Sequence, residues 1–168
     1  MRRNPAAVVS ALFFAAAPGT VAALGPYLVG GWRTHEPFPV PIMVPLRVAG
    51  VILIAAGLVV LVHAFVRFVV EGLGTPMPVA PPEQLVVGGL YRYVRNPMYV
   101  AILTAIIGQA MLFGDRGLLF YAAAVALTVW SFVHWYEEPD LRRRFGAAYD
   151  DYRANVPGWW PRLRPFRP

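Results

Sequence analysis

The sequence predicts an all-helical integral membrane protein with about four membrane-spanning helices, the last two forming a hairpin, and a C-terminal amphipathic helix at the membrane interface. Of the 168 residues, 58% are hydrophobic and only 14% are charged, a balance typical of membrane proteins. Long apolar runs alternate with short segments rich in arginine, proline and glycine, as spans alternate with connecting loops. We expect one domain over residues 1–168, with two N-terminal spans in residues 1–70 and a polar, functional half in residues 71–161.

The charged and sulfur-containing residues argue against several classes of function. All 15 basic residues are arginines, and they flank apolar runs. We therefore interpret the net charge of +6 as membrane topology and contact with lipid headgroups, and we expect no nucleic-acid partner. There is no cysteine, and the three histidines have no metal-binding spacing, so we expect no metal site. The arginine-only composition suggests a GC-rich genome and the inner membrane of a bacterium.

The first two predicted spans precede the polar half. Residues 5–31 are apolar and indicate a helix that Pro18-Gly19 and Gly25-Pro26 make irregular, so neighbouring helices must cover its freed backbone groups. A signal peptide is the alternative interpretation of this opening. Residues 32–45 are predicted to be a loop, and residues 46–70 the second span. Gly50 and Gly57 lie on one face of that span and favour close packing against another helix.

A polar stripe ends the second span. His63, Arg67 and Glu71 recur at intervals of four residues, which places them on one helix face. They are either an interfacial ion pair with a neighbouring histidine or one wall of a site that begins at Gly89. Residues 72–88 carry several prolines and are predicted to be a loop.

A helical hairpin follows. Residues 98–113 and 118–136 are apolar, and residues 114–117, Gly-Asp-Arg-Gly, are a tight turn. Its polar members are expected to face protein: Thr104, Gln109, Thr128, Ser131 and His134.

The last predicted helix covers residues 139–156. Pro139 suits its first turn, and apolar side chains recur at intervals of three and four residues. Two ion pairs at i,i+4 are expected along it, Glu138–Arg142 and Asp140–Arg144. Residues 158–161, Gly-Trp-Trp-Pro, and the arginines after them are interpreted as an interfacial tail.

The arginines also predict the orientation. With a cytoplasmic N-terminus and four spans, eleven arginines are cytoplasmic and three are outside, a strong positive-inside bias. The C-terminus is then cytoplasmic as well. The same orientation puts residues 89–99 and Glu137–Glu138 on the cytoplasmic side.

Two polar clusters flank the hairpin, at residues 91–99 and 136–144. Because a hairpin returns its ends to the same place, we expect them to form one pocket. Arginine can bind a carboxylate, a glutamate can bind ribose hydroxyls or an ammonium, and tyrosine can stack on a purine. This set suits a polar cofactor of mixed charge. An interfacial anchor of Tyr and Arg is the equally weighted alternative.

Two motifs resemble a known family. Residues 88–99, GGLYRYVRNPMY, resemble the G-x-Y-x-x-x-R-[HN]-P-x-Y motif of the isoprenylcysteine carboxyl methyltransferases. Residues 137–161, EEPDLRRRFGAAYDDYRANVPGWWP, are similar to that family's E-E-x-x-L…F-G-x-x-Y-x-x-Y…V-P…P signature. The motifs have the right order and enclose a hydrophobic hairpin. Related membrane methyltransferases, which act on phospholipid amines or small thiols, share much of this half.

The resemblance implies methyl transfer from S-adenosylmethionine to a lipophilic acceptor, with membrane lipids as the other partners. The chemistry of methyl transfer then suggests the catalytic residues: Glu137 or Glu138 is the candidate base for an acceptor that arrives protonated, and Arg95 is the candidate to position an anionic acceptor. Many relatives have histidine where this chain has Asn96, and asparagine cannot act as a titrating base. The residues that the resemblance implies for cofactor binding are Gly89, Leu90, Tyr91, Arg95, Asn96, Pro97, Tyr99, Glu137, Glu138, Arg142, Tyr149 and Tyr152.

Two alternatives remain open at this point. Membrane sterol reductases are distantly similar in the C-terminal region and use a nicotinamide cofactor. The second alternative is a non-enzymatic membrane scaffold that kept the fold. Asn96, in place of the common histidine, is the feature that favours it. The acceptor and the oligomeric state are not determined by the sequence; a small isoprenoid acid, a lipid amine and a hydrophobic thiol are all consistent with it.

Overall fold

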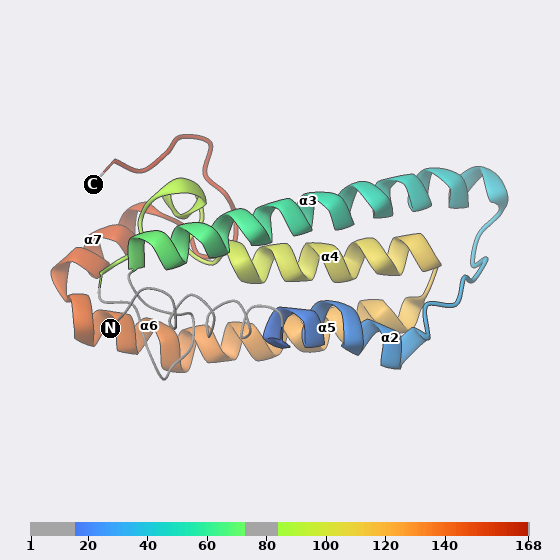
Figure 1. The fold of residues 1–168 in the computed structure, drawn as a ribbon, viewed down its shortest axis with the longest axis horizontal. Helices are drawn as coiled ribbons and strands as arrows, with labels where there is room; N and C mark the ends of the chain where they lie inside the picture. The colour runs from blue at the N-terminus through green and yellow to red at the C-terminus, as the bar shows by residue number, and fades with distance from the viewer. Residues whose placement is uncertain (1–15, 73–83, 168) are drawn as a thin grey trace.

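The structure is a computed structural model that describes residues 16–72 and 84–167. All regular elements in this part of the chain are helices, which confirms the all-helical class. Helices α3 (Val40–Gly72), α4 (Pro97–Phe113) and α5 (Arg116–Phe132) form an elongated bundle, and the C-terminal helices gather at one end of it (Figure 1).

The first described segment contains the expected irregularity. Helical residues 16–19 lead into a π-helix, η1 (Thr20–Leu24), and then into α2 (Gly25–Gly30). The side chains of Gln109 and Tyr121 donate hydrogen bonds to the carbonyls of Ala22 (2.7 Å) and Val21 (2.9 Å). Neighbouring helices therefore cover backbone groups of the irregular segment, as expected. The start of the predicted span and the signal-peptide alternative concern residues 1–15, which lie outside the described residues.

Helix α3 begins at Val40, so the prediction of a loop up to residue 45 was wrong. Pro41 lies in the first turn, where no N–H group has an acceptor within the helix, so its lack of an N–H costs no hydrogen bond. Pro45 lies further along and removes only one backbone hydrogen bond of the helix. The predicted close packing is confirmed: a Cβ atom on Gly50 would lie 2.6 Å from the Gly108 carbonyl oxygen, and one on Gly57 would lie 2.8 Å from that of Ala101. The glycines thus bring α3 and α4 into backbone contact.

The hairpin of α4 and α5 is confirmed. Gly114 ends α4 in the left-handed conformation (φ +65°), and the Asp115 side chain accepts a hydrogen bond from the Gly117 N–H (2.7 Å) to begin α5. The predicted end at residue 136 was wrong, because the helix continues through a π-helix, η3 (Val133–Glu137), into α6 (Glu138–Phe145). The π-turn directly ahead of Pro139 lets the chain pass this proline without leaving the helix.

The predicted helix over residues 139–156 is two helices. It breaks at Gly146, whose φ of +51° lies in the left-handed region, and α7 (Ala147–Asn155) follows. The apolar face still assembles, because Leu141 and Phe145 of α6 pack on a buried cluster of Tyr149, Tyr152, Val156 and Phe166. The break therefore folds α7 back toward the bundle.

Within residues 16–72 and 84–167, two helices are long and apolar enough to cross a membrane, Val40–Phe68 and Arg116–Phe145, so the number of four spans stays a prediction. Helix α4 is shorter, with 17 residues. Many large apolar side chains on α3 and α5 are exposed, as they are where helices face lipid. Gln109 is buried as expected, but Thr128 and His134 are exposed, so the prediction that they face protein was wrong for these two.

Candidate active site

The polar motif between α3 and α4 is held in place by the C-terminal tail. It begins as a 3₁₀ turn, η2 (Gly89–Arg92), and Asn96 is the residue before α4. The N–H groups of Arg95 and Asn96 donate to the carbonyls of Pro157 (2.9 Å) and Gly158 (3.2 Å). The tail segment is therefore paired along the motif through its backbone, an arrangement that the interpretation as an interfacial tail did not include.

The polar stripe of α3 contacts the start of the motif. The Gly88 N–H donates to Glu71 Oε2 (2.9 Å), and Arg67 pairs with the other oxygen of Glu71 (3.0 Å). A Cβ atom on Gly89, whose φ is +55°, would lie 3.1 Å from His63 Nε2. Both interpretations of the stripe hold in part: it contains the expected ion pair, and it packs against Gly88 and Gly89.

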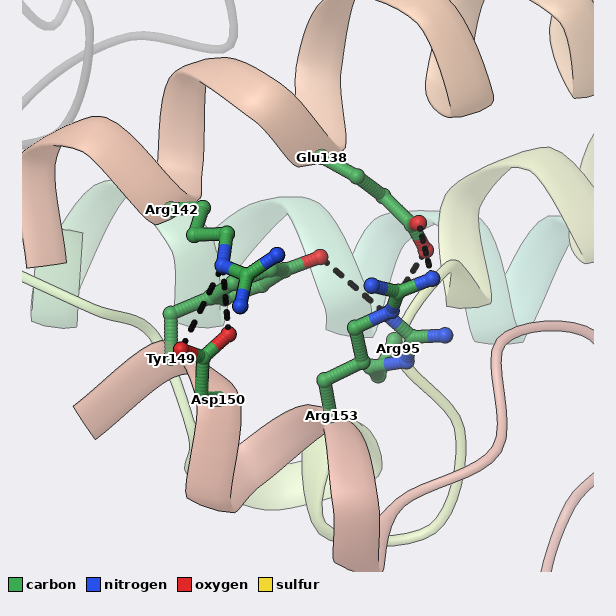
Figure 2. A network of polar contacts seen from close by, with 6 residues as sticks. All are labelled: Arg95, Glu138, Arg142, Tyr149, Asp150 and Arg153. Carbon is green, nitrogen blue, oxygen red and sulfur yellow. Dashed lines mark hydrogen bonds and ion pairs between the residues drawn. The ribbon is translucent and has the colours of Figure 1, made fainter. Parts of the chain in front are cut away.

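The two ends of the hairpin meet in a charge network that is partly buried (Figure 2). Arg95 Nη1 lies 2.7 Å from Glu138 Oε1 and donates to the Tyr149 hydroxyl at 3.1 Å. Arg153 of α7 pairs with the other oxygen of Glu138 at 3.2 Å. The Arg95 and Glu138 side chains are only 14% and 13% exposed, so these charge-assisted bonds act in a low dielectric. The network fixes the guanidinium of Arg95.

The neighbouring carboxylate of Glu137 has a different environment. Tyr99 donates its hydroxyl hydrogen to Glu137 Oε2 (3.2 Å), and the Tyr99 ring lies against Trp159, with ring centroids 6.4 Å apart. Adjacent helical residues point about 100° apart. Glu138 is therefore turned toward two arginines, whereas Glu137 lines a cavity.

The cavity has a volume of about 220 Å³ and lies within the bundle. Six residues at its polar end come from the motif and one from η3: Tyr91, Arg95, Asn96, Pro97, Met98, Tyr99 and Glu137. The remaining walls are apolar: Ala17, Pro18, Val21, Phe65, Phe68, Ile102, Val125 and Val129. The space is thus amphipathic, with its polar groups at the ends of α4 and η3.

Three buried polar atoms of cavity-lining residues have no hydrogen-bond partner among the described residues: the Tyr91 hydroxyl, Arg95 Nε and Asn96 Nδ2. Buried polar groups are nearly always paired in folded proteins. Burial, and secondarily the charge of Glu137, raises the pKa of Tyr91 well above its usual value, so its hydroxyl stays a hydrogen-bond donor. These atoms suit a bound molecule that offers acceptors.

The remaining predicted site residues lie behind the lining or outside it. The Tyr152 hydroxyl donates to the Tyr91 carbonyl (2.7 Å), and Leu90 and Gly89 belong to the supporting turn. Arg142 is exposed and pairs with Asp150 (3.0 Å), so the predicted Glu138–Arg142 pair was wrong. The break at Gly146 brings α7 alongside α6, which gives both residues other partners. The predicted Asp140–Arg144 pair is present at 2.7 Å.

Sequence reasoning missed three groups of residues at this site. Arg153 completes the charge network, Trp159 contacts Tyr99, and the apolar walls come from four separate helical segments. Phe65 and Phe68 alone had a local signal, since they flank Arg67 of the polar stripe. The others depend on contacts between distant parts of the chain.

The fold and cavity define a helical protein of membrane type with an amphipathic cavity. The family model of phospholipid methyltransferases matches residues 46–148, from α3 to the start of α7, and the chain belongs to this family. A curated protein-S-isoprenylcysteine O-methyltransferase from Schizosaccharomyces pombe is 38% identical over 82 residues, which are 46% of this chain and 33% of that relative. The chain thus matches about a third of the relative's length. No solved structure matches significantly. The resemblance noted in the sequence is confirmed.

Proposed function

We propose that this protein transfers a methyl group from S-adenosylmethionine to a lipophilic acceptor at the polar end of the cavity. One observation carries the proposal: buried donors without partners and the Glu137 carboxylate lie in the same cavity as a set of apolar walls. Membership of a family of methyltransferases supports it independently. The relative's printed name, a protein-S-isoprenylcysteine O-methyltransferase, supports an acceptor with a hydrocarbon part.

The residues at the polar end fit this methyl donor. The donor carries a carboxylate, an ammonium and ribose hydroxyls, and it supplies a methyl group already activated by its sulfonium. Arg95 and Asn96 offer N–H donors suited to the carboxylate, and Tyr91 offers a hydroxyl. Glu137 suits the ammonium or the ribose hydroxyls. Pro97 and Tyr99 complete this end of the cavity.

The protein's own contribution is orientation and exclusion of water. Glu138, Tyr149 and Arg153 hold the Arg95 network, so Arg95 is fixed before a ligand binds. We assign Glu138 as a positioning residue for Arg95, because both its carboxylate oxygens are paired with arginines. Arg95 is suited to an anionic acceptor, and Glu137 to taking a proton from a protonated thiol or amine. Asn96 acts as a neutral hydrogen-bond donor.

We further propose that the polar end faces the cytoplasm, in a bacterial inner membrane. The arginines support this orientation, because they are concentrated at the polar end and in the C-terminal tail. Segments rich in arginine favour the cytoplasmic side of a membrane. The test is thiol labelling from either side of sealed vesicles, after introduction of single cysteines by Arg164→Cys and Arg116→Cys. Labelling of the residue-164 position from the cytoplasmic side supports the orientation; labelling from the other side contradicts it.

The function is tested by calorimetric binding of S-adenosylhomocysteine, the product of the donor, to detergent-purified protein. The variant Glu137→Gln, Glu138→Gln is compared with Asp151→Asn, which alters an exposed carboxylate of α7. We expect micromolar binding that is lost in the double variant and retained in the control. A folded wild-type protein that binds NADPH instead would favour a reductase, and one that binds neither would favour a scaffold.

A further inference from the structure

The C-terminal tail, residues 157–167, carries an inference that rests on the proposed function and deepens it. We propose that the outward side of this tail is a docking surface for anionic lipid headgroups of the surrounding membrane, and that docking strengthens binding of the methyl donor. The surface consists of two apolar side chains and two arginines: Trp160, Leu163, Arg164 and Arg167. The regulator of the site is then the anionic fraction of the membrane itself.

The inward side of the tail is fixed to the polar motif. The Arg162 N–H donates a hydrogen bond to the Tyr93 carbonyl (2.9 Å). Phe166 and Arg92 are paired twice: the Phe166 N–H donates to the Arg92 carbonyl (2.9 Å), and Arg92 Nε donates to the Phe166 carbonyl (2.7 Å). The Phe166 ring also packs against Tyr152 in a buried cluster. The tail is thus held at the end of the bundle that contains α6 and α7 (Figure 1).

The outward side of the tail is exposed. Trp160 is 81% exposed and Leu163 is 99% exposed. Arg164 and Arg167 are exposed as well, and neither has a hydrogen-bond or ion-pair partner among the described residues. Exposed large apolar side chains interleaved with cations are typical of segments that lie in the membrane interface. The tail therefore offers both the apolar and the cationic part of such a contact.

The arginines of the tail differ from those of α6 and α7. Each arginine of those two helices has a carboxylate partner: Arg142, Arg143, Arg144 and Arg153. In the tail, Arg162 Nη1 donates to the Asn155 carbonyl (2.6 Å) rather than to a carboxylate. The described residues therefore do not neutralise the positive charge of the tail, and this charge is available to anionic headgroups.

The tail lies near the level at which the apolar span of α3 ends. That span runs to Phe68. About one turn later, Glu71 accepts a hydrogen bond from the Gly88 N–H (2.9 Å) at the start of the polar motif. The tail is paired along this same motif. The end of the span and the tail thus lie close together, where hydrocarbon gives way to headgroups and tryptophan and arginine are favoured.

The same tail holds two residues that line the cavity. The N–H groups of Arg95 and Asn96 donate to the carbonyls of Pro157 (2.9 Å) and Gly158 (3.2 Å). A chain terminus frays unless it is tied down. Docking of the outward side would tie down the tail and so favour the arrangement of Arg95 and Asn96 that receives the methyl donor. Because coupling between two binding sites is reciprocal, the donor must in turn strengthen docking.

The docking is tested with a fluorophore at residue 163. The chain has no cysteine, so Leu163→Cys accepts an environment-sensitive thiol label at this position alone. The label is followed in nanodiscs in which phosphatidylglycerol replaces phosphatidylcholine stepwise. We expect its emission to shift to shorter wavelength as the anionic fraction rises. Each arginine near an anionic surface strengthens binding roughly fivefold, so Arg164→Gln with Arg167→Gln should remove most of this response.

The matched control removes the same charge from α6. Arg143→Gln with Arg144→Gln changes two arginines that both pair with Asp140, and we expect the full response of the label. A label that does not respond to phosphatidylglycerol overturns the inference. An equal loss of response in the control also overturns it, because net charge rather than the tail would then attract the lipid.

The coupling is tested by calorimetric binding of S-adenosylhomocysteine in the same nanodiscs. We expect the Kd to be about fivefold lower in anionic than in neutral lipid. The tail variant should lose this difference, and the α6 control should keep it. Equal affinity in both lipids overturns the inference while the proposed function stands. Absent binding in either lipid, beside an intact response of the label, would instead remove the proposed function and the coupling together and leave the docking surface.

Discussion

Both ends of the bundle carry polar residues, but the hydrogen-bonding groups of these residues are paired differently at the two ends. At the end with the hairpin turn, Asp115 accepts from the Gly117 N–H, and Arg47 pairs with Glu36, which is 59% exposed. At the other end, the Arg95 and Glu138 side chains are only 14% and 13% exposed, and three polar atoms of cavity-lining residues lack partners among the described residues. The polar residues at the hairpin-turn end serve to terminate and cap helices. Those at the other end are suited to a ligand, because their unpaired atoms line a cavity.

Arg47 sharpens this comparison, because its Nε is also buried without a partner in the described part of the chain. It lies on α3, and its guanidinium is matched by an exposed carboxylate. An unpaired atom alone therefore does not distinguish a site. The distinction is that Arg95 lines a cavity, whereas Arg47 does not line the open pocket at its own end of the bundle, and that a network of contacts fixes the Arg95 guanidinium.

The largest effect is expected from Arg95→Ala. It leaves Glu138 with one partner, Arg153, and should lower the free energy of unfolding by about 3 kcal/mol and abolish S-adenosylhomocysteine binding. Arg47→Ala at the opposite end should cost at most about 1 kcal/mol and leave binding intact. Thermal unfolding and calorimetry on both variants test the comparison. Equal loss of binding in Arg47→Ala would show that the two ends do not differ in this way.

A smaller effect is expected from Gly158→Ala. A Cβ atom there would lie 3.2 Å from Arg95 Nη2 and 3.4 Å from Asn96 Nδ2, so both side chains must shift slightly. We expect affinity for S-adenosylhomocysteine to fall several-fold with little change in stability. Gly19→Ala is the matched control, since its Cβ would meet nothing within 4 Å. Unchanged affinity in the Gly158 variant would mean that the tail does not position these two residues.

At the opposite end, Asp115→Ala should affect stability alone. The side chain caps α5 at the Gly117 N–H, and loss of such a cap costs about 1 kcal/mol. Thermal unfolding should shift to lower temperature, while S-adenosylhomocysteine affinity stays at the wild-type value. A change in affinity would connect the turn to the cavity and remove the contrast between the two ends.

The last prediction concerns alkaline pH, where the effect is absent at neutral pH and grows only above the usual phenol pKa. Burial raises the pKa of Tyr91, of Tyr152 and, with the charge of Glu138, of Tyr149. Since the folded state holds these protons more tightly, their contribution is complete below the usual phenol pKa of about 10 and is lost as the pH rises above it. Unfolding followed by circular dichroism from pH 8 to 11 should show this loss. Tyr152→Phe should make the decline shallower, and an identical slope would contradict the assignment.

The sequence by itself determined the features that depend on neighbouring residues. The hairpin follows from two apolar runs around a Gly-Asp-Arg-Gly turn, and the close packing of α3 against another helix follows from Gly50 and Gly57 on one face. The motifs at the hairpin ends also had to meet. These features rest on helical periodicity and turn chemistry, which act over a few residues.

Only the tertiary structure decided which groups meet. Glu138 and Arg142 had ideal helical spacing, yet Glu138 pairs with Arg95 and Arg153, because the break at Gly146 folds α7 back. The cavity likewise needs walls from four segments of the chain. Helical spacing offers an exposed pair only a few tenths of a kcal/mol, whereas burial of paired charges and apolar surface involves several kcal/mol. Long-range packing therefore decided the partners that local spacing could only suggest.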